Sequence, residues 1–420
     1  MAISRRDILR GGAAAAATAA FGGTLGKVLA DSPTRSADRL IIVFARGGWD
    51  TTLSIDPKPE VPTIDTPDGA VRRFADLPIW SHPTRPSVDA FFERWAERTA
   101  VVHGIEVRSF VHLDCEKRML TGTPSDTAPD LGALAADCLG RDRPIPYLVL
   151  GGVARSGPLE ALVGRVGATN QVLSLVDPRM AYPDVTGTPE LTLTSGEQAL
   201  VARFAAANDA RLRATRGMRA SNARRIEEFI GSSSRAEDLS AFVRQAGLGD
   251  RQLVVDPRVQ LGLGVQALAS ELSQAVLVEV GGFDSHQNNH AVQTIRQEQL
   301  FSALTGLMTD LEEAGLQDDT TVAVMSEMGR TPLLNGQDGK DHWPTASAML
   351  IGARVRGGRA YGATDDLFQG EALDLATGEI DGPDAKRIQT GNLIAGVLEL
   401  VGVDPSELFP GVEPLRAFTA

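Results

Sequence analysis

The sequence predicts an α/β fold, a three-layer sandwich in which a mostly parallel central sheet lies between two layers of helices. Short, almost continuous apolar runs recur along the chain, which is typical of strands that are buried on both faces. Segments with helical spacing alternate with these runs, as crossovers between parallel strands require. Of the 420 residues, 43% are hydrophobic and 23% are charged, so we expect one packed domain with insertions.

The N-terminal part begins with a strand and a long loop. The first strand is predicted over residues 40–44, an apolar run that ends at a Gly-Gly pair just before Asp50. Residues 57–76 are rich in Pro, Asp and Thr and should form a surface loop. A helix is expected over residues 87–98, and residues 100–103 form a second short strand.

The next part of the chain is mainly helical. Residues 109–121 are predicted to form a helix, because a Thr-Gly-Thr-Pro sequence supplies the usual stop signals at its end. A helix over residues 131–139 and a buried strand over residues 147–150 follow. The segment 196–247 contains mostly Ala, Arg and Glu at helical spacing, and we interpret it as a helical insertion that covers one face or the mouth of a site.

Regular alternation characterises the C-terminal part. Strands are predicted over residues 275–280, 321–325 and 348–351, and helices over residues 290–314 and 391–401. The carboxyl ends of parallel strands meet at one edge of a sheet. We therefore expect the polar residues that follow these strands to lie close together.

The N-terminus predicts export by the twin-arginine machinery. Arg5-Arg6 precedes a weakly apolar Ala/Gly stretch that ends in residues suited to a signal peptidase, so we expect a signal peptide over residues 1–30 with cleavage after Ala30. Residues 31–420 would then fold as a single domain before export, and the protein would be periplasmic or secreted. The alternative is a short Ala-rich helix on a cytosolic protein.

The acidic balance of the chain limits its partners. The formal net charge is −13, and it becomes −16 when cleavage removes the four basic side chains and one acidic side chain of residues 1–30. Such a charge disfavours nucleic acid and anionic membranes. It is compatible with a small anionic ester, because a bound metal ion would invert the local field. Beyond residue 30 the sequence has no apolar run long enough to span a bilayer.

Oxygen and nitrogen donors collect after the predicted strands. Asp284 and His286 follow the strand over residues 275–280, and alternate residues of an extended segment point to the same side, so both could bind one ion. Alternatively, the preceding Gly-Gly pair is a turn, Asp284 caps the next helix and His286 bonds locally. The two cysteines, Cys115 and Cys138, lack the spacing of a thiolate metal site and are interpreted as buried thiols or a disulfide.

Further donors lie beside other strand ends. Asp50 and Glu327 each follow a strand, and Asp341-His342 follows a loop rich in Gly, Asn and Asp. Asp50 could instead be a turn residue, and Glu327 could pair with Arg330. Asp341-His342 could be an exposed turn. Their recurrence beside buried strands predicts one or two divalent metal ions, with zinc, manganese and calcium all open.

His112 is a separate candidate. It lies near the start of the predicted helix over residues 109–121, where backbone N–H groups favour anions. In that position it could bind metal or act as a general acid or base. The alternative is a histidine that caps its own helix.

In these motifs the chain resembles domain of unknown function 1501, a bacterial exported family of the alkaline phosphatase and sulfatase superfamily. The matching segments are the twin-arginine start, Phe44-Ala-Arg-Gly-Gly-Trp-Asp50, Gly281-Gly-Phe-Asp284-Ser-His286, and Ser326-Glu327-Met-Gly-Arg330-Thr-Pro with Asp341-His342 after it. The resemblance implies an alkaline phosphatase-like fold with a one- or two-metal site at the C-terminal edge of its sheet. It implies, as metal ligands, Asp50, Asp284, His286, Glu327, Asp341 and His342.

Two departures from the superfamily pattern bear on the chemistry. Met328 stands where many relatives carry a histidine, so one ion is expected to be weak or missing. Where sulfatases carry a modified Cys or Ser, this chain has His112. Direct attack by a metal-bound hydroxide, with His112 as ligand or proton shuttle, is therefore expected in place of a covalent enzyme intermediate.

The prediction from these observations is an exported metal-dependent hydrolase of a phosphate or sulfate ester. Arg330 and Lys340 are expected to pair with the ester anion, although Arg330 could instead brace Glu327. The alternative is a non-catalytic exported protein of the same fold that keeps a structural ion and acts as a binding or assembly partner. The missing nucleophile and Met328 favour this alternative, whereas the retained donors oppose it.

Overall fold

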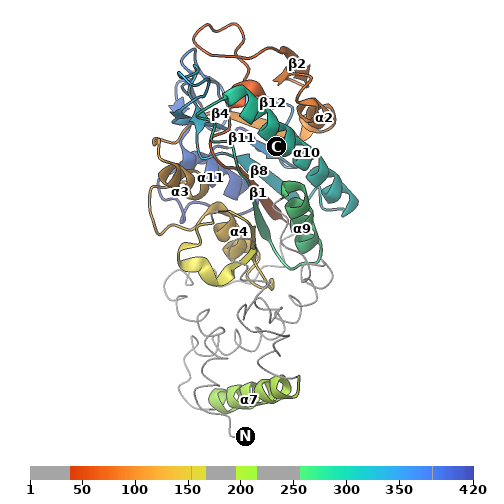
Figure 1. Ribbon diagram of the computed structural model, residues 1–420. Helices are drawn as coiled ribbons and strands as arrows, with labels where there is room; N and C mark the ends of the chain where they lie inside the picture. The colour runs from red at the N-terminus through yellow and green to blue at the C-terminus, as the bar shows by residue number, and fades with distance from the viewer. Residues whose placement is uncertain (1–37, 153, 167–194, 215–255, 381) are drawn as a thin grey trace.

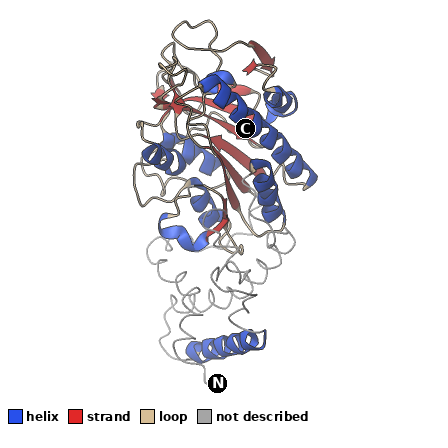
Figure 2. Cartoon of the chain, viewed as in Figure 1, coloured by secondary structure: helices blue, strands red, loops and turns tan. Residues whose placement is uncertain are grey.

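A computed structural model of the chain shows a central sheet with helices on both faces (Figures 1 and 2). It describes residues 38–152, 154–166, 195–214, 256–380 and 382–420. Eight described strands form the sheet in the order β12-β4-β11-β8-β1-β7-β5-β6. In that order, their bounds are Arg359–Tyr361, Thr99–Glu106, Thr345–Ile351, Thr320–Met325, Arg39–Ala45, Ala275–Val280, Tyr147–Leu150 and Val163–Val166.

Most neighbouring strands of this sheet are parallel. β1 is parallel to β7 on one side and to β8 on the other, with Val43 opposite both Val278 and Val324. β5 is parallel to β7 and β6, and β12 is parallel to β4. β11 is antiparallel to both of its neighbours, β4 and β8. The predicted α/β fold with a mostly parallel central sheet is therefore confirmed.

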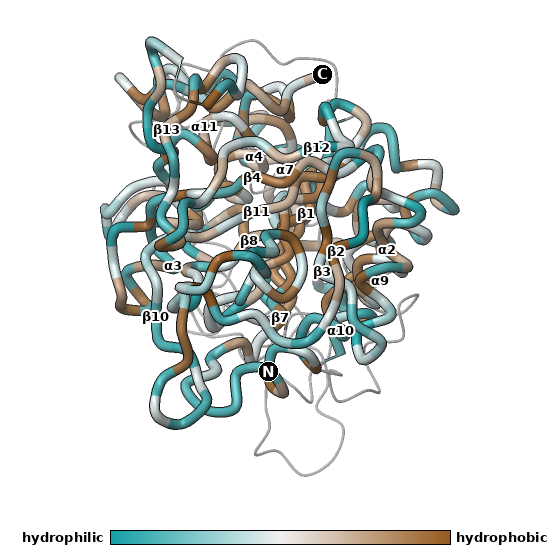
Figure 3. Tube along the Cα trace, turned by 90° about the horizontal axis from the view of Figure 1, so that it is seen from above, coloured by the Kyte–Doolittle hydropathy of each residue, from teal (hydrophilic) through white to brown (hydrophobic). Residues whose placement is uncertain are grey.

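Two hydrophobic cores separate the sheet from its helical layers. Ile41 and Val43 of β1 belong to one core, and Leu40 and Ile42 belong to the other, as alternation along a strand requires. In Figure 3, hydrophobic segments gather near the labels of the central strands and hydrophilic segments dominate the periphery. The first core takes residues from α2 (Pro86–Trp95), α9 (Pro257–Ala269) and α10 (Asn289–Glu313), and the second from α3 (His112–Thr121), α4 (Leu131–Leu139) and α11 (Thr390–Leu400).

The direction of β11 decides which residues meet at one edge of the sheet. The C-terminal ends of β1, β4, β7 and β8 lie at this edge. Because β11 is antiparallel, its N-terminal end lies there too, and residues that precede β11 join residues that follow the other strands. His342 reaches the edge in this way from the short strand β10 (His342–Trp343), which pairs with β9 (Gly329–Arg330).

A β-hairpin occupies part of the segment that the sequence predicts as a surface loop. β2 (Ala70–Phe74) and β3 (Leu77–Ser81) pair in antiparallel fashion inside and just beyond residues 57–76. Ala75, in the connecting turn, has a φ of 51°. β2 is exposed at every position except Phe74, so it lacks the apolar run that would reveal a strand, and the loop prediction is wrong there.

Two further elements differ from their predicted form. The strand expected over residues 348–351 begins at Thr345, and it is the antiparallel member of the sheet. The helix expected over residues 87–98 ends at Trp95 and continues as a 3-10 turn over Ala96–Arg98. The other predicted helices and strands among the described residues appear within a few residues of their expected bounds.

Several predictions fall wholly or partly outside the described residues. The predicted signal peptide over residues 1–30 lies outside them, as does most of the predicted insertion, whose first part is the helix α7 (Ser195–Arg213). Among the described helices, none has the length and apolar character needed to cross a membrane.

Cys115 and Cys138 are free thiols, so the disulfide alternative is wrong. Burial raises the pKa of each thiol to about 11.

Candidate metal centre

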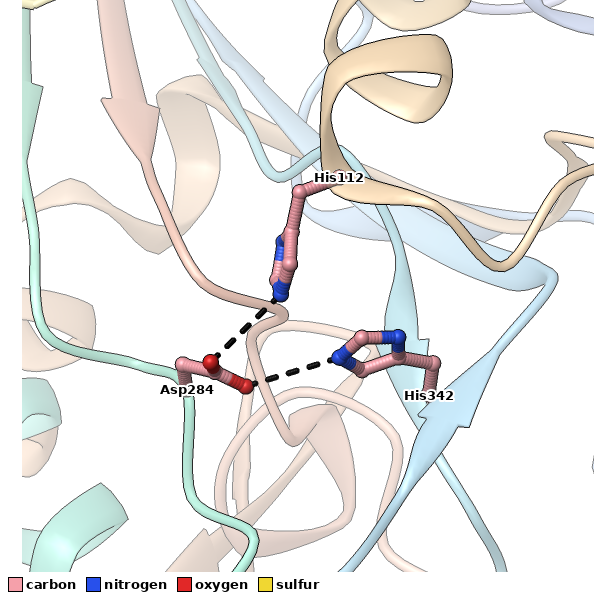
Figure 4. Close-up of side chains that lie close together, drawn as sticks. All are labelled: His112, Asp284 and His342. Carbon is pink, nitrogen blue, oxygen red and sulfur yellow. Dashed lines mark ion pairs between the residues drawn. The ribbon is translucent and has the colours of Figure 1, made fainter.

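Three side chains that are distant in the sequence converge at the edge of the sheet (Figure 4). His112 is the first residue of α3, Asp284 follows β7, and His342 begins β10. One ligand atom from each lies within 4.8 Å of the other two. The Nε2 atom of His112 is 3.5 Å from Oδ2 of Asp284, and the Nε2 atom of His342 is 3.5 Å from Oδ1.

Three histidines at this edge are held in the same way. Each imidazole uses Nδ1 for a hydrogen bond and has Nε2 near Asp284. The partners, with their distances from Nδ1, are Glu327 Oε1 for His112 (2.8 Å), Asp341 Oδ1 for His286 (2.8 Å) and the Phe110 carbonyl for His342 (2.6 Å). The Nε2 atom of His286 lies 3.2 Å from Asp284 Oδ1 and 2.9 Å from Nε2 of His342. An acceptor at Nδ1 fixes the tautomer whose Nε2 can bind a metal.

The donor set fits a divalent transition metal. Imidazole nitrogens and a carboxylate oxygen suit zinc, with bonds of about 2.0–2.2 Å. Two donors of one ion are therefore at most about 4.4 Å apart, which is close to the separation of these three atoms, all within 4.8 Å of one another. The Nε2 atom of His112 is buried and has no hydrogen-bond partner within the described part of the chain. A buried nitrogen without a partner is expected where a ligand completes the site.

Neighbouring charges adjust the ionisation of the three donors. Partial burial by itself raises the pKa of Asp284, but the Arg330 guanidinium, 2.6 Å away, and the nearby histidines lower it below its ordinary value. Burial lowers the pKa of His342 and so favours the neutral ring that a metal needs. The hydrogen bond to Glu327 raises the pKa of His112, so a metal ion would compete with a proton for this ring.

Glu327 and Asp341 orient the histidine rings in this arrangement, whereas the sequence predicts both as direct ligands. Glu327 is fully buried and accepts the Gly47 N–H at 2.8 Å as well as the His112 ring. Asp341 is exposed, and its hydrogen bond with the His286 ring lowers the pKa of Asp341. Metal-binding histidines commonly carry such a carboxylate on the nitrogen that faces away from the ion.

Asp50, a predicted ligand, and Lys340, a predicted substrate contact, pair with each other. Both side chains are fully buried, and Nζ of Lys340 lies 3.0 Å from Oδ2 of Asp50. Asp50 also accepts hydrogen bonds from the Thr52 hydroxyl at 2.6 Å and the Asn289 amide at 2.7 Å. Burial by itself raises the pKa of Asp50, but Lys340 and these hydrogen bonds lower it. In this arrangement the Lys340 ammonium neutralises the Asp50 carboxylate.

Arg330, the other predicted substrate contact, is a buried brace. Its guanidinium donates hydrogen bonds to the carbonyl oxygens of Gly47, Gly48 and Lys340 and to the Asp284 carboxylate. The segments that follow β1 and β7 and the one that precedes β11 are thereby tied together. The carboxylate that Arg330 braces is Asp284, and not Glu327 as the sequence suggests.

Comparison with known proteins agrees with the sequence motifs. A family model described as "Protein of unknown function (DUF1501)" matches residues 37–415, which is most of the chain. The chain belongs to this family. A search of curated proteins finds no significant match.

This DUF1501 chain is similar to several solved structures at low identity. Ps i-CgsB is 10% identical, with a TM-score of 0.44, and the match covers 91% of this chain and 76% of that one. A 2-O GAG sulfatase is 9% identical, with a TM-score of 0.39, over 91% of this chain and 75% of the sulfatase. A protein in the alkaline phosphatase superfamily from Vibrio parahaemolyticus is 11% identical, with a TM-score of 0.35, and the match covers 96% of this chain and 76% of that one.

Sequence reasoning missed a row of buried amides on α10 of the DUF1501 chain. Asn289, Gln293 and Gln297 recur every fourth residue, so they lie on one face of the helix, and all three are fully buried. Gln293 accepts the Asp50 N–H at 3.1 Å and donates to the Gly48 carbonyl at 3.1 Å, while Gln297 donates to the Asp50 carbonyl at 2.8 Å. This face fixes the segment that follows β1. The four-residue spacing of these amides in the sequence could have revealed a polar helix face that packs on the site.

Substitution of Gly47 by alanine is expected to destabilise the DUF1501 chain. Gly47 has a φ of +120°, and a Cβ there would lie 2.4 Å from the Asp284 backbone nitrogen. Backbone strain and overlap together should lower the free energy of unfolding by about 2–5 kcal/mol, as measured by urea denaturation. Gly336→Ala is the matched control, because a Cβ at that position meets nothing within 4 Å. Equal stability of the two variants would contradict the tight approach at Gly47.

Proposed function

We propose that this chain is an exported metal-dependent hydrolase that acts on a phosphate or sulfate ester. The observation that carries the proposal is the set of three imidazoles anchored at Nδ1, each with Nε2 within 3.5 Å of an Asp284 oxygen. A purely structural cluster has no need to bring three such rings to one carboxylate. Export is supported by Arg5-Arg6 and the weakly apolar stretch before Ala30.

A single zinc ion held by His112, Asp284 and His342 is the proposed centre. Imidazole nitrogens favour zinc over calcium, which takes a larger number of oxygen ligands. Three protein ligands with an open fourth position are typical of catalytic zinc. When bound, the ion would supply Lewis acidity that polarises the ester and lowers the pKa of water. We propose one ion because Lys340 already neutralises Asp50.

The remaining polar groups would orient the donors and manage protons. Glu327 and the Phe110 carbonyl fix two rings, and Arg330 fixes the Asp284 carboxylate. His286 is predicted from the sequence as a ligand, and in the structure its Nε2 lies 3.2 Å from Asp284 Oδ1 and 2.9 Å from Nε2 of His342, beside the proposed trio. We assign His286 to holding a proton at Nε2 for the departing alcohol, since an imidazole beside a carboxylate is suited to acid–base work.

The hydrolase proposal predicts turnover of simple aryl esters. The mature chain loaded with zinc should hydrolyse p-nitrophenyl phosphate or p-nitrophenyl sulfate, lose this activity with a chelator and regain it when zinc is restored. His286→Gln should lower kcat by about 10²-fold without changing the zinc content, because general acid–base groups contribute about 10²–10⁴-fold. His82→Gln is the matched control, since the half-buried His82 ring forms its hydrogen bonds within its own loop, with Thr84. Loss of zinc in His286→Gln would instead identify His286 as a ligand.

One observation supports a second candidate function, a non-catalytic exported protein that acts as a binding or assembly partner. Arg330 and Lys340, the cations expected to meet an ester anion, are both buried and bonded within the protein. One equivalent of bound zinc without turnover of either ester would favour this candidate. Less than one equivalent of tightly bound metal, with no hydrolysis of either ester, would refute the hydrolase proposal.

A further inference from the structure

An exposed apolar strip borders the metal centre. Phe110, Val111 and Leu113, which we call the apolar rim, have exposed fractions of 56%, 62% and 62%. They flank His112 in the sequence at the start of α3. Large apolar residues that are exposed together beside a polar site commonly mark a binding surface.

A backbone contact ties the rim to one of the donor histidines. The Phe110 carbonyl accepts the hydrogen bond of His342 Nδ1, so this residue cannot move without moving a donor ring. Val111 is the N-cap residue of α3, and its carbonyl accepts the Cys115 N–H at 2.8 Å. The rim is therefore a fixed border of the centre.

Packing of α3 does not explain the rim. The helix buries Cys115, Glu116, Met119 and Leu120 against the body of the protein. The rim residues lie in the turn before this buried face and contribute nothing to either core cluster. Three apolar side chains that flank His112 in the sequence thus stay more than half exposed and outside both cores.

We propose that the ester bound at the centre carries an apolar alkyl or aryl group that lies on the rim. This inference rests on the proposed function, because the rim residues flank His112, a proposed ligand of the ion that would hold the ester anion. A cover that occupied the rim alone, such as a second copy of the chain or a lipid surface, would also crowd His112. A single amphiphilic ester uses the donors and the rim together, and a net charge of −13 opposes docking on an anionic membrane.

Binding of alkylphosphonates, which resemble phosphate monoesters but do not hydrolyse, tests the inference. Titration calorimetry of the zinc-loaded mature protein should show octylphosphonate binding at least about tenfold more tightly than butylphosphonate. Full burial of each methylene strengthens binding about fourfold, but the rim would cover only one side of the alkyl group. The variant F110S/V111S/L113S should bind both ligands with the butylphosphonate affinity. The matched control V259S/I295S changes residues that are 41% and 57% exposed on α9 and α10, which pack on the opposite core from α3, and should keep the preference.

The outcomes separate the inference from the proposed function. Equal affinity for the two phosphonates, or a preference that survives in F110S/V111S/L113S, would overturn the inference and leave the hydrolase proposal standing. Absence of binding to either phosphonate would overturn both. Rim-dependent binding to phosphatidylcholine vesicles, or a rim-dependent dimer in gel filtration, combined with equal phosphonate affinities, would assign the rim to a membrane or a second copy instead.

Discussion

Asparagine at position 284 is expected to abolish tight metal binding. Asp284 is the acid of the donor trio, and its two oxygens separately face His112 and His342. Asparagine keeps the shape of the side chain but removes the charge that offsets a divalent ion. Loss of even an indirect partner of a metal ligand lowers metal affinity by about 10–100-fold, so loss of the carboxylate itself should cost at least about 100-fold. Competition with a chromophoric chelator measures this affinity, and ester hydrolysis should fall in parallel.

The control for this substitution removes a carboxylate that has no part in the centre. Asp126→Asn breaks an exposed contact with Lys117 at 2.8 Å and should leave zinc content unchanged. Arg330 loses its anionic partner in Asp284→Asn but keeps three carbonyl acceptors, so the far-UV circular dichroism spectrum should be preserved. Zinc bound by Asp284→Asn with wild-type affinity would place the ion elsewhere and refute the proposed trio.

The sequence predicts most of the fold because the central strands are buried on both faces. The strands at residues 147–150 and 275–280 have the predicted bounds, since their apolar runs end at Gly-Gly pairs. The β2–β3 hairpin escapes the same reasoning because β2 is mostly exposed. The antiparallel direction of β11 was accessible in principle. The segment that joins β8 to β11 contains no helical pattern, and a parallel connection normally needs one.

The sequence identifies the side chains that converge at this edge of the sheet, but not their individual partners. The topology brings His112, Asp284 and His342 to one edge, and all three are identified from the sequence as candidate site residues. Side-chain rotation then decides which atoms face the centre. The contact between Lys340 and Asp50 joins residues at opposite ends of the sequence, and no spacing rule foretells such a pair.

Replacement of Lys340 by methionine is expected to be the most destabilising of these changes. The Asp50 carboxylate would stay fully buried, still bonded to Thr52 and Asn289 but without its ammonium partner. Removal of one partner of a buried ion pair commonly lowers the free energy of unfolding by about 3–5 kcal/mol. Urea denaturation at pH 7 measures the loss. Lys386→Met is the matched control, because it removes a lysine whose contact with Glu413 lies at the surface, and little change is expected.

The pH dependence of this loss of stability distinguishes an unpaired buried charge from poor packing. In the wild type, burial raises the pKa of Asp50, but Lys340 and the hydrogen bonds lower it, and the net pKa is below the ordinary value of 3.8. The pair therefore stabilises the fold fully above pH 3.8, and this contribution is lost as the pH falls further. Without Lys340, burial should raise the pKa of Asp50. The deficit of Lys340→Met should then be largest near pH 7 and shrink toward pH 4, where Asp50 becomes neutral. The double variant Asp50→Asn with Lys340→Met should recover most of the stability at pH 7. A loss of stability that is independent of pH and persists in the double variant would mean that side-chain shape, and not charge, determines the effect.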